Sequence, residues 1–269
     1  MADMRAKMSE LYSLEQLSSQ KSSIHALHPL SKIIATLTYI ICVVSLDGYS
    51  FSQLAPFVFY PVIVIALADI PYSMIWRRAL VALPFCAFAG LSNVIFVRET
   101  AFYIGSLPVS FGAISFFTII FRTLLCVSAV LILVAVTPFA QLTAQLRRMH
   151  VPQMLISVFE MTYRYIGTLV NEAYSMSTAY KLRAGDKKGV QMKDMGSFAG
   201  QLLLRSFDRA ERVYAAMKCR GYAMRDALLK PLPLKKNDYI FTAAVCLSCV
   251  LFRAVDVQQM LTDVLGRMM

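Results

Sequence analysis

Phe111–Val136 has the sequence FGAISFFTIIFRTLLCVSAVLILVAV, in which Arg122 is the only charged residue. A helix that crosses a bilayer needs about 20 predominantly apolar residues, so this run predicts a membrane-spanning helix. An arginine at the bilayer centre costs about 2.5–3.5 kcal/mol on insertion scales. We therefore expect Arg122 to reach the interface or to pair where helices meet; the alternative is that it lines a contact with a partner.

Four further apolar runs surround this one. The chain has 269 residues, of which 58% are hydrophobic, and a mean hydropathy of +0.58, whereas a soluble domain is usually about 45–50% apolar. We expect an all-α, polytopic membrane protein with about five transmembrane helices. Pro56 and Pro61 are tolerated in such a helix where neighbours satisfy the freed carbonyls. The other four predicted spans cover residues 30–46, 51–68, 79–97 and 239–255.

Charge predicts the orientation of these spans. Residues 137–238 hold 17 Lys and Arg against 8 Asp and Glu. Cations also gather in the N-terminal leader, where Lys32 is one of four, whereas two of the short loops are poor in them. By the positive-inside rule, the N-terminus and residues 137–238 are cytoplasmic. The net charge of +11 therefore reflects cytoplasmic loops of an inner membrane protein rather than binding of nucleic acid.

The predicted organisation has three parts. Residues 1–136 form the leader and the first four spans, residues 137–238 form cytoplasmic coupling helices, and residues 239–269 form the last span and a tail. No secretory signal is expected, because a polar leader precedes the first apolar run.

The cytoplasmic stretch predicts three helices. Thr137 is a suitable N-cap and Pro138 a suitable first residue for a short amphipathic helix, which Val151-Pro152 would end. Helical stripes of apolar residues then predict helices over 153–183 and 197–219. On the first of these, we expect Glu160, Arg164 and Glu172 to form internal pairs rather than a catalytic site.

Few residues suggest chemistry on this chain. Cys246-x-x-Cys249 has the spacing of a redox or metal pair, but its apolar surroundings favour helix packing. His25 and His28 lack nearby cysteines and carboxylates, and His150 is most simply a helix end, so we expect no metal site. Because there is no Walker A pattern, any ATP hydrolysis must come from a partner. We expect a non-catalytic subunit with no cofactor of its own.

Two short segments share the pattern Ala-x-x-x-Arg-small. Arginine at a helix C-terminus stabilises it by about 0.3–1 kcal/mol, so a single such segment is usually a simple helix end. Two of them, at the ends of two amphipathic cytoplasmic helices, favour contacts with two equivalent grooves of a partner. The segments are Ala179-Tyr180-Lys181-Leu182-Arg183-Ala184, followed by Gly185, and Ala216-Met217-Lys218-Cys219-Arg220-Gly221.

Longer runs around these segments resemble a known family. The similarity covers most of the chain and is most specific between residues 137 and 222. It is to the transmembrane T component of energy-coupling factor (ECF) transporters, nearest to the cobalt-transport branch, CbiQ. The runs that carry it are Ile24–Lys32, Thr137-Pro138-Phe139, Leu146–Pro152, Met161–Ile166, Glu172-Ala173 and Arg205–Tyr222.

The resemblance implies a specific role. Such a T component holds two coupling helices against two ATP-binding-cassette ATPases, which bind ATP and Mg, and it also binds a substrate-specific membrane S component. Arg183 and Arg220 would be the anchors, with Ala179 and Ala216 one turn before them. Gly221 fits the family pattern, whereas Ala184 departs from it, with glycine one position later.

Cobalt or nickel import into a bacterial or archaeal cell is the function that the resemblance implies. A vitamin-importing T component is an alternative, because it shares the coupling motifs. A self-contained secondary carrier is a further one. A carrier is expected to show an inverted repeat and ionisable groups near the midplane, but the chain offers only Arg122 and no obvious repeat.

Overall fold

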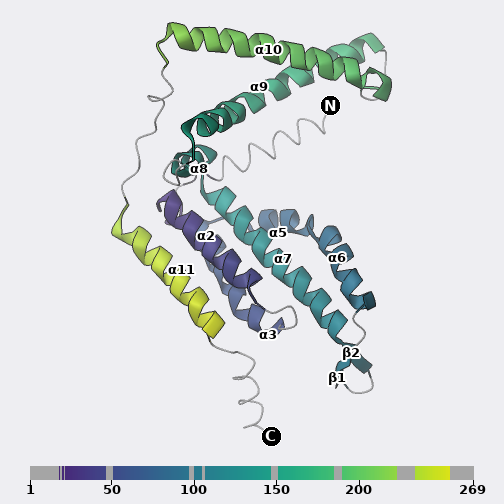
Figure 1. The fold of residues 1–269 in the computed structure, drawn as a ribbon, viewed down its shortest axis with the longest axis vertical. Coiled ribbons are helices and arrows are strands. Elements are labelled where there is room, and N and C mark those ends of the chain that lie inside the picture. The colour runs from purple at the N-terminus through teal and green to yellow at the C-terminus, as the bar shows by residue number, and fades with distance from the viewer. Residues whose placement is uncertain are drawn as a thin grey trace. The chain divides into compact units, whose positions relative to one another are not determined.

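The computed structural model describes residues 18, 20, 22–46, 51–96, 100–104, 107–146, 151–184, 190–222 and 234–254. The chain divides into two compact units. One holds the described residues up to Phe139 together with those from 234 onward, and is called the bundle. The other holds the described residues from Ala140 to Tyr222, and is called the coupling unit. Figure 1 shows the ribbon of the whole chain.

The bundle is built around one long helix, α7, which contacts α2, α3, α4, α5 and α6. Helix α11, from the other end of the chain, packs along α2 (Figure 1). The elements are α2 (Pro29–Val44), α3 (Phe51–Leu54), η1 (Ala55–Val58), α4 (Phe59–Ala68), α5 (Tyr72–Leu80), α6 (Leu83–Phe96), β1 (Thr100–Ile104), β2 (Leu107–Ser110), α7 (Phe111–Val136) and α11 (Lys236–Ala254).

Local sequence accounts for several helix boundaries. Pro29 stands at the first position of α2, where its missing N–H group costs nothing. Asp69 ends α4 in the left-handed conformation, with φ of 54°, a conformation that Asp tolerates better than most residues. The predicted third span, residues 79–97, corresponds mainly to α6, and a bend of 49° separates α6 from α5 before it.

Length and composition identify fewer spans than the sequence predicts. Among the described residues, Gly112–Val136 alone is a helix long and apolar enough to cross a membrane, and the bent pair α5 and α6 is a second if it counts as one span. Pro29–Val44 and Ala55–Ala68 are apolar but shorter. The predicted second span is divided, because α3, η1 and α4 follow one another there.

Among the described residues, a small β-hairpin adds to the all-helical fold that the sequence predicts. Strands β1 and β2 pair antiparallel, with Ile104 opposite Leu107 and an irregularity between Thr100 and Phe102. The strands contain aromatic and β-branched residues, which favour extended structure, on either side of Gly105-Ser106, a common hairpin signal. The prediction treated this stretch only as a loop between spans.

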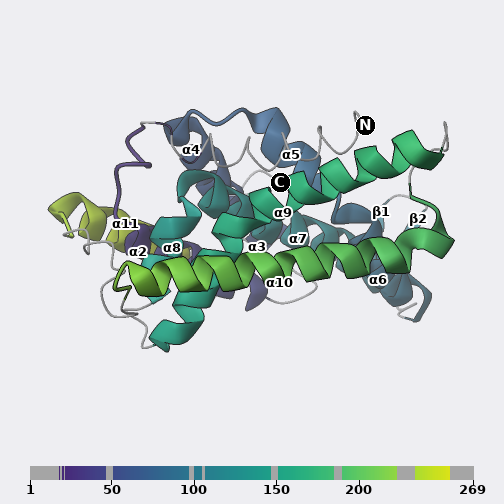
Figure 2. The ribbon, with the colours of Figure 1, turned by 90° about the horizontal axis from the view of Figure 1, so that it is seen from above.

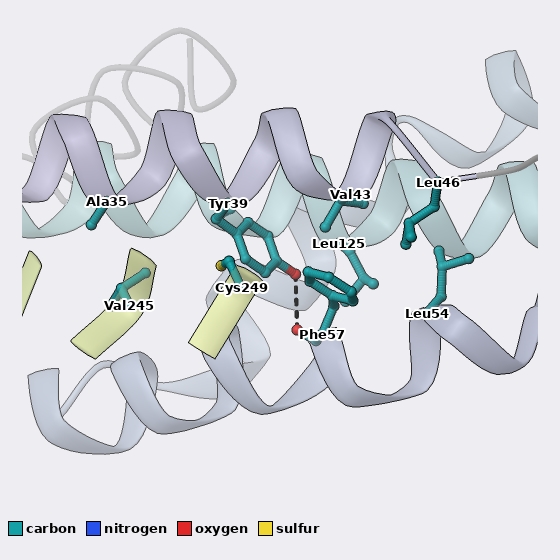
Figure 3. Packing of buried hydrophobic residues seen from close by; sticks show 10 residues of the cluster. Ala35, Tyr39, Val43, Leu46, Leu54, Phe57, Leu125, Val245 and Cys249 are labelled. Atoms are coloured by element: carbon teal, nitrogen blue, oxygen red, sulfur yellow. Dashed lines mark hydrogen bonds between the residues drawn. The ribbon is translucent and has the colours of Figure 1, made fainter. Parts of the chain in front are cut away.

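The bundle core shows how a proline is accommodated in a predicted span. Pro61 has no N–H group, so it cannot supply the α-helical hydrogen bond to the carbonyl of Phe57, four residues earlier. The Tyr39 hydroxyl donates to that carbonyl at 2.9 Å, and both side chains are almost fully buried (Figure 3). The requirement that a neighbour satisfy the freed group is therefore met. The surrounding core residues are Ala35, Val43, Leu46, Leu54, Leu125, Ala129, Val245 and Cys249.

Replacing Tyr39 with phenylalanine is expected to destabilise the bundle by about 1–3 kcal/mol, because a buried acceptor loses its donor. Tyr60→Phe is the matched control: the Tyr60 ring stacks on Tyr39 at 4.4 Å, but among the described residues its hydroxyl meets only Thr36, which also donates to the Lys32 carbonyl. Thermal unfolding in detergent measures both. In a Pro61→Ala background the cost of Tyr39→Phe should shrink, and equal costs in the two backgrounds would contradict this account.

Arg122 has a structural partner at a helix interface. Its Nη2 donates to the Leu46 carbonyl at 2.6 Å, just beyond the C-terminal end of α2. A cation is favourable at this negative end of a helix. The structural interpretation of Arg122 therefore accounts for its place in the longest apolar helix.

The cysteine pair of α11 belongs to the packing of the bundle. Cys249 is buried in the core described above, and the Cys246 sulfur lies 3.8 Å from the Thr38 hydroxyl on α2. All six cysteines are free thiols. The prediction that this pair is a packing feature is confirmed.

Candidate functional site

The coupling unit consists of helices close to the predicted ones. Both long helices begin and end within two residues of the predicted bounds, because the breakers at Val151-Pro152 and Gly221 are local signals. The elements are α8 (Phe139–Leu146, whose first residue belongs to the bundle), α9 (Gln153–Ala184), η3 (Met192–Asp194) and α10 (Met195–Cys219).

The start of α8 differs from the prediction. The helix begins at Phe139, so Pro138 precedes it instead of occupying its first position. Among the residues that the structure describes, the buried Thr137 hydroxyl has no hydrogen-bond partner, because it lies one residue too early to reach the free N–H groups of the first turn. The predicted cap is therefore wrong. Residues 147–150, including His150, lie outside the described residues.

Helices α9 and α10 form an antiparallel hairpin. Near the turn, the Tyr180 hydroxyl donates to Asp194 Oδ2 at 2.6 Å, and this hydrogen bond raises the pKa of Tyr180 because it favours the protonated phenol. Further along, Glu172 pairs with Arg205 and, at 3.4 Å, with Arg209. Glu172 is therefore paired with α10, and not within α9 as the sequence predicted. Figure 2 shows the two helices joined at one end.

The hairpin separates the two arginine motifs. Arg183 lies in the last turn of α9, where the chain turns toward α10, whereas Arg220 lies at the far end of α10. The 25 residues of α10 rise about 38 Å. Both arginines are exposed, as are Ala179 and Ala216. The structure therefore presents two accessible cationic helix ends and does not bring them together.

The second motif has the helix ending that its glycine predicts. Gly221 has φ of +68°; its N–H donates to the Lys218 carbonyl, and the N–H of Tyr222 donates to that of Met217, both at 3.0 Å. These two bonds make a Schellman ending, which satisfies carbonyls that the helix leaves free. In the first motif, Ala184 is the last residue of α9, and Gly185 lies outside the described residues.

An apolar groove of about 660 Å³ runs between α9 and α10. Met161 and Ile166 of α9 line it, together with Val213 and Met217 of α10 and Tyr222, which follows α10. Exposed apolar patches of this kind often mark binding surfaces. The predicted apolar faces of the two helices are therefore largely uncovered: side chains at least 43% exposed include Leu155, Phe159, Ile166, Leu203, Phe207 and Tyr214.

The remaining candidates have local partners. His25 Nδ1 lies 2.7 Å from the Ser22 hydroxyl, and His28 Nδ1 accepts from the Leu30 N–H, so His28 caps α2. Glu160 accepts from the Thr143 hydroxyl at 3.2 Å, and Arg164 lies over the Tyr165 ring. Within the part of the chain that the structure describes, no three His, Cys, Asp or Glu side chains group as metal ligands would.

Two buried charged residues had no role in the sequence analysis. Lys32 counted there only as a leader cation and Asp238 only as the end of the polar stretch, but they are 4% and 2% exposed. Both lie at one end of the bundle, where Asp238 accepts from the N–H group of His28, 210 residues away in the sequence. No sequence signal joins residues at such a separation.

Comparison with known proteins gives a family match. Residues 20–229 match the family CbiQ, described as cobalt transport protein. An uncharacterized Methanocaldococcus jannaschii protein is 30% identical over 113 residues, which cover 41% of this chain and 39% of that protein. The cobalt transport protein CbiQ of Rhodobacter capsulatus is 32% identical over 102 residues (38% and 42%). The nickel permease LarQ of Lactiplantibacillus plantarum is 31% identical over 86 residues (32% and 32%).

The aligned stretches span less than half the length of each of these relatives. The family match is much longer, and includes both arginine motifs and the coupling unit from Ala140 to Tyr222. This chain therefore belongs to the CbiQ family, whose members are the non-catalytic transmembrane T components of cobalt- and nickel-type ECF transporters.

Proposed function

We propose that this protein couples ATP hydrolysis by two partner ATP-binding-cassette ATPases to uptake of a substrate through a membrane S component. The two exposed arginine ends of the α9–α10 hairpin carry the proposal. The two arginines lie at opposite ends of the hairpin, and α10 alone rises about 38 Å, a length that is too large for one groove. Such a spacing suits two related grooves, one on each of two partner subunits.

The residues of the two ends suit such contacts. Arg183 and Arg220 each present a planar guanidinium beside a small residue one turn earlier, Ala179 or Ala216, where a partner surface can approach closely. In an ATPase groove the guanidinium would meet carboxylates or the carbonyls of a helix end. A hydrogen bond to a charged group contributes about 1.5–3 kcal/mol. Lysine could not reproduce the planar fork of N–H donors that the guanidinium presents.

The proposal includes five membrane segments. These are α2, the series α3 to α4, α6, α7 and α11. Charge supports an N-terminus and a coupling region on the cytoplasmic side, including the basic last turn of α5 with Arg77 and Arg78. The membrane would be the cytoplasmic membrane of a bacterium or archaeon.

A cobalt or nickel ion is the proposed cargo. The names of two relatives, cobalt transport protein and nickel permease, support it. In this proposal the ion passes through the S component, and ATP and Mg bind to the partner ATPases, so the chain itself holds no cofactor. The uncovered apolar faces of α9 and α10 support the presence of a partner beyond the arginine contacts.

Reconstitution tests the function directly. The chain is co-expressed with the ATPase and S component of one operon, purified through a tag on this chain, and placed in liposomes. We expect two ATPase subunits and one further membrane subunit to co-purify, and cobalt uptake to require ATP. Cobalt transport by this chain alone in liposomes would instead establish a self-contained carrier.

A further inference from the structure

Three helix ends meet at one end of the bundle, where α2 and α11 begin and α7 ends (Figure 1). Asp238, in the first turn of α11, accepts from two backbone N–H groups. One belongs to His28, which caps α2, at 2.8 Å; the other belongs to Lys235, directly before α11, at 2.7 Å. A carboxylate is favourable at the positive end of a helix. Asp238 therefore holds the beginnings of two helices together.

Lys32 supplies the opposite charge at the same place. Its Nζ donates to the carbonyl of Val136, the last residue of α7, and to that of His25, both at 3.2 Å. The cation thus lies at the negative end of α7, and it is attracted by Asp238. Buried charges persist only where such partners compensate the loss of water. We call the pair Lys32 and Asp238 the junction.

The chain leaves the bundle for the coupling unit, and returns to the bundle, at residues that the junction binds. The chain leaves the bundle after α7, whose last carbonyl Lys32 binds, and it returns at Lys235, whose N–H Asp238 binds. α8 follows Val136 by two residues, and α11 follows Lys235 directly. A displacement of the coupling unit that is passed along either of these two connections therefore enters the bundle through groups that these two side chains hold.

We propose that Lys32 and Asp238 are positioning residues that transmit motion of the coupling helices to the bundle by fixing both connections to the start of α2. The inference rests on the proposed coupling function. With the junction intact, α2, α7 and α11 move as one body. Without it, the ends of α7 and α11 yield separately, and ATP hydrolysis no longer drives the bundle.

Asp238→Asn tests the proposal in the reconstituted complex. Asparagine keeps the shape of the side chain but removes its charge, and its amide can satisfy the two N–H groups only through one oxygen. We expect cobalt uptake per ATP hydrolysed to fall roughly tenfold, with ATPase co-purification and ATP hydrolysis unchanged. Asp69→Asn is the matched control: the same charge is lost from an exposed, left-handed position that asparagine also accepts.

A double variant separates transmission from stability. Asp238→Asn alone leaves Lys32 buried without its opposing charge, which can lower stability, whereas Lys32→Gln/Asp238→Asn removes both charges and should restore it. The junction is still broken, so uptake per ATP is expected to stay low although the melting temperature recovers. Recovery of both quantities together would show a purely structural role and overturn the proposal.

Measurements on the wild-type complex distinguish failure of the proposed coupling function from failure of the proposed role of the junction. If the wild type shows no ATP-dependent cobalt uptake, the proposed coupling function fails. If the wild type takes up cobalt and Asp238→Asn does so with the same yield per ATP, the proposed function stands and the role of the junction is refuted.

Discussion

Arg220→Glu is expected to abolish ATP-driven uptake while the protein stays in the membrane. The substitution removes a guanidinium that can contribute about 1.5–3 kcal/mol to a contact with a charged groove. It also places a carboxylate at the negative end of α10. The helix ending survives, because it is made by the backbone N–H groups of Gly221 and Tyr222. Uptake of cobalt into vesicles and the amount of protein in the membrane are the two measurements.

Arg212→Glu is the matched control for that experiment. It makes the same charge change on an exposed position of the same helix, two turns before Arg220, and uptake should persist. Arg220→Lys keeps the charge but loses the planar fork, so we expect intermediate uptake. Wild-type uptake by Arg220→Glu would exclude Arg220 as an anchor.

Replacing both anchors, in Arg183→Glu/Arg220→Glu, is expected to release the ATPases. The two sites are separated by the length of α10, so their losses should add. Together they amount to about 3–6 kcal/mol, on the values for charge-assisted bonds, which corresponds to roughly 10²- to 10⁴-fold in affinity. Purification through a tag on this chain, followed by quantification of the ATPase, measures the effect.

A second double variant controls for net charge. Arg164→Glu/Arg212→Glu changes the charge of the coupling helices by the same amount at exposed positions away from their ends, and it should retain the ATPases. An intact complex purified with Arg183→Glu/Arg220→Glu would rule out the arginines as the main attachment points and would direct attention to the groove between α9 and α10.

The features that were predictable from sequence are those with local causes. Pro152 and Gly221 end or begin helices through their own backbone preferences, so the bounds of α9 and α10 followed from the sequence to within two residues. The small hairpin β1–β2 was missed, because a short extended segment gives a weaker sequence pattern than the long apolar runs on either side of it.

The arrangement of the candidate site required the structure. Nothing in the two motifs says that α9 and α10 run antiparallel, so the distance between Arg183 and Arg220 was not predictable. The junction was missed for a similar reason: a buried Lys32 looks like a leader cation until α11 brings Asp238 beside it. Long-range pairing of this kind leaves no periodic trace in either segment.

The rigid length of α10 has a consequence for how the protein can vary. An inserted residue within the helix would turn Arg220 by about 100° around the axis and move it about 1.5 Å further from Arg183. A surplus of seven residues would nearly restore its direction but lengthen the span by about 10 Å. In the proposed function, the length of α10 sets the spacing between the two ATPase contacts, so changes in chain length could be absorbed only outside the helix.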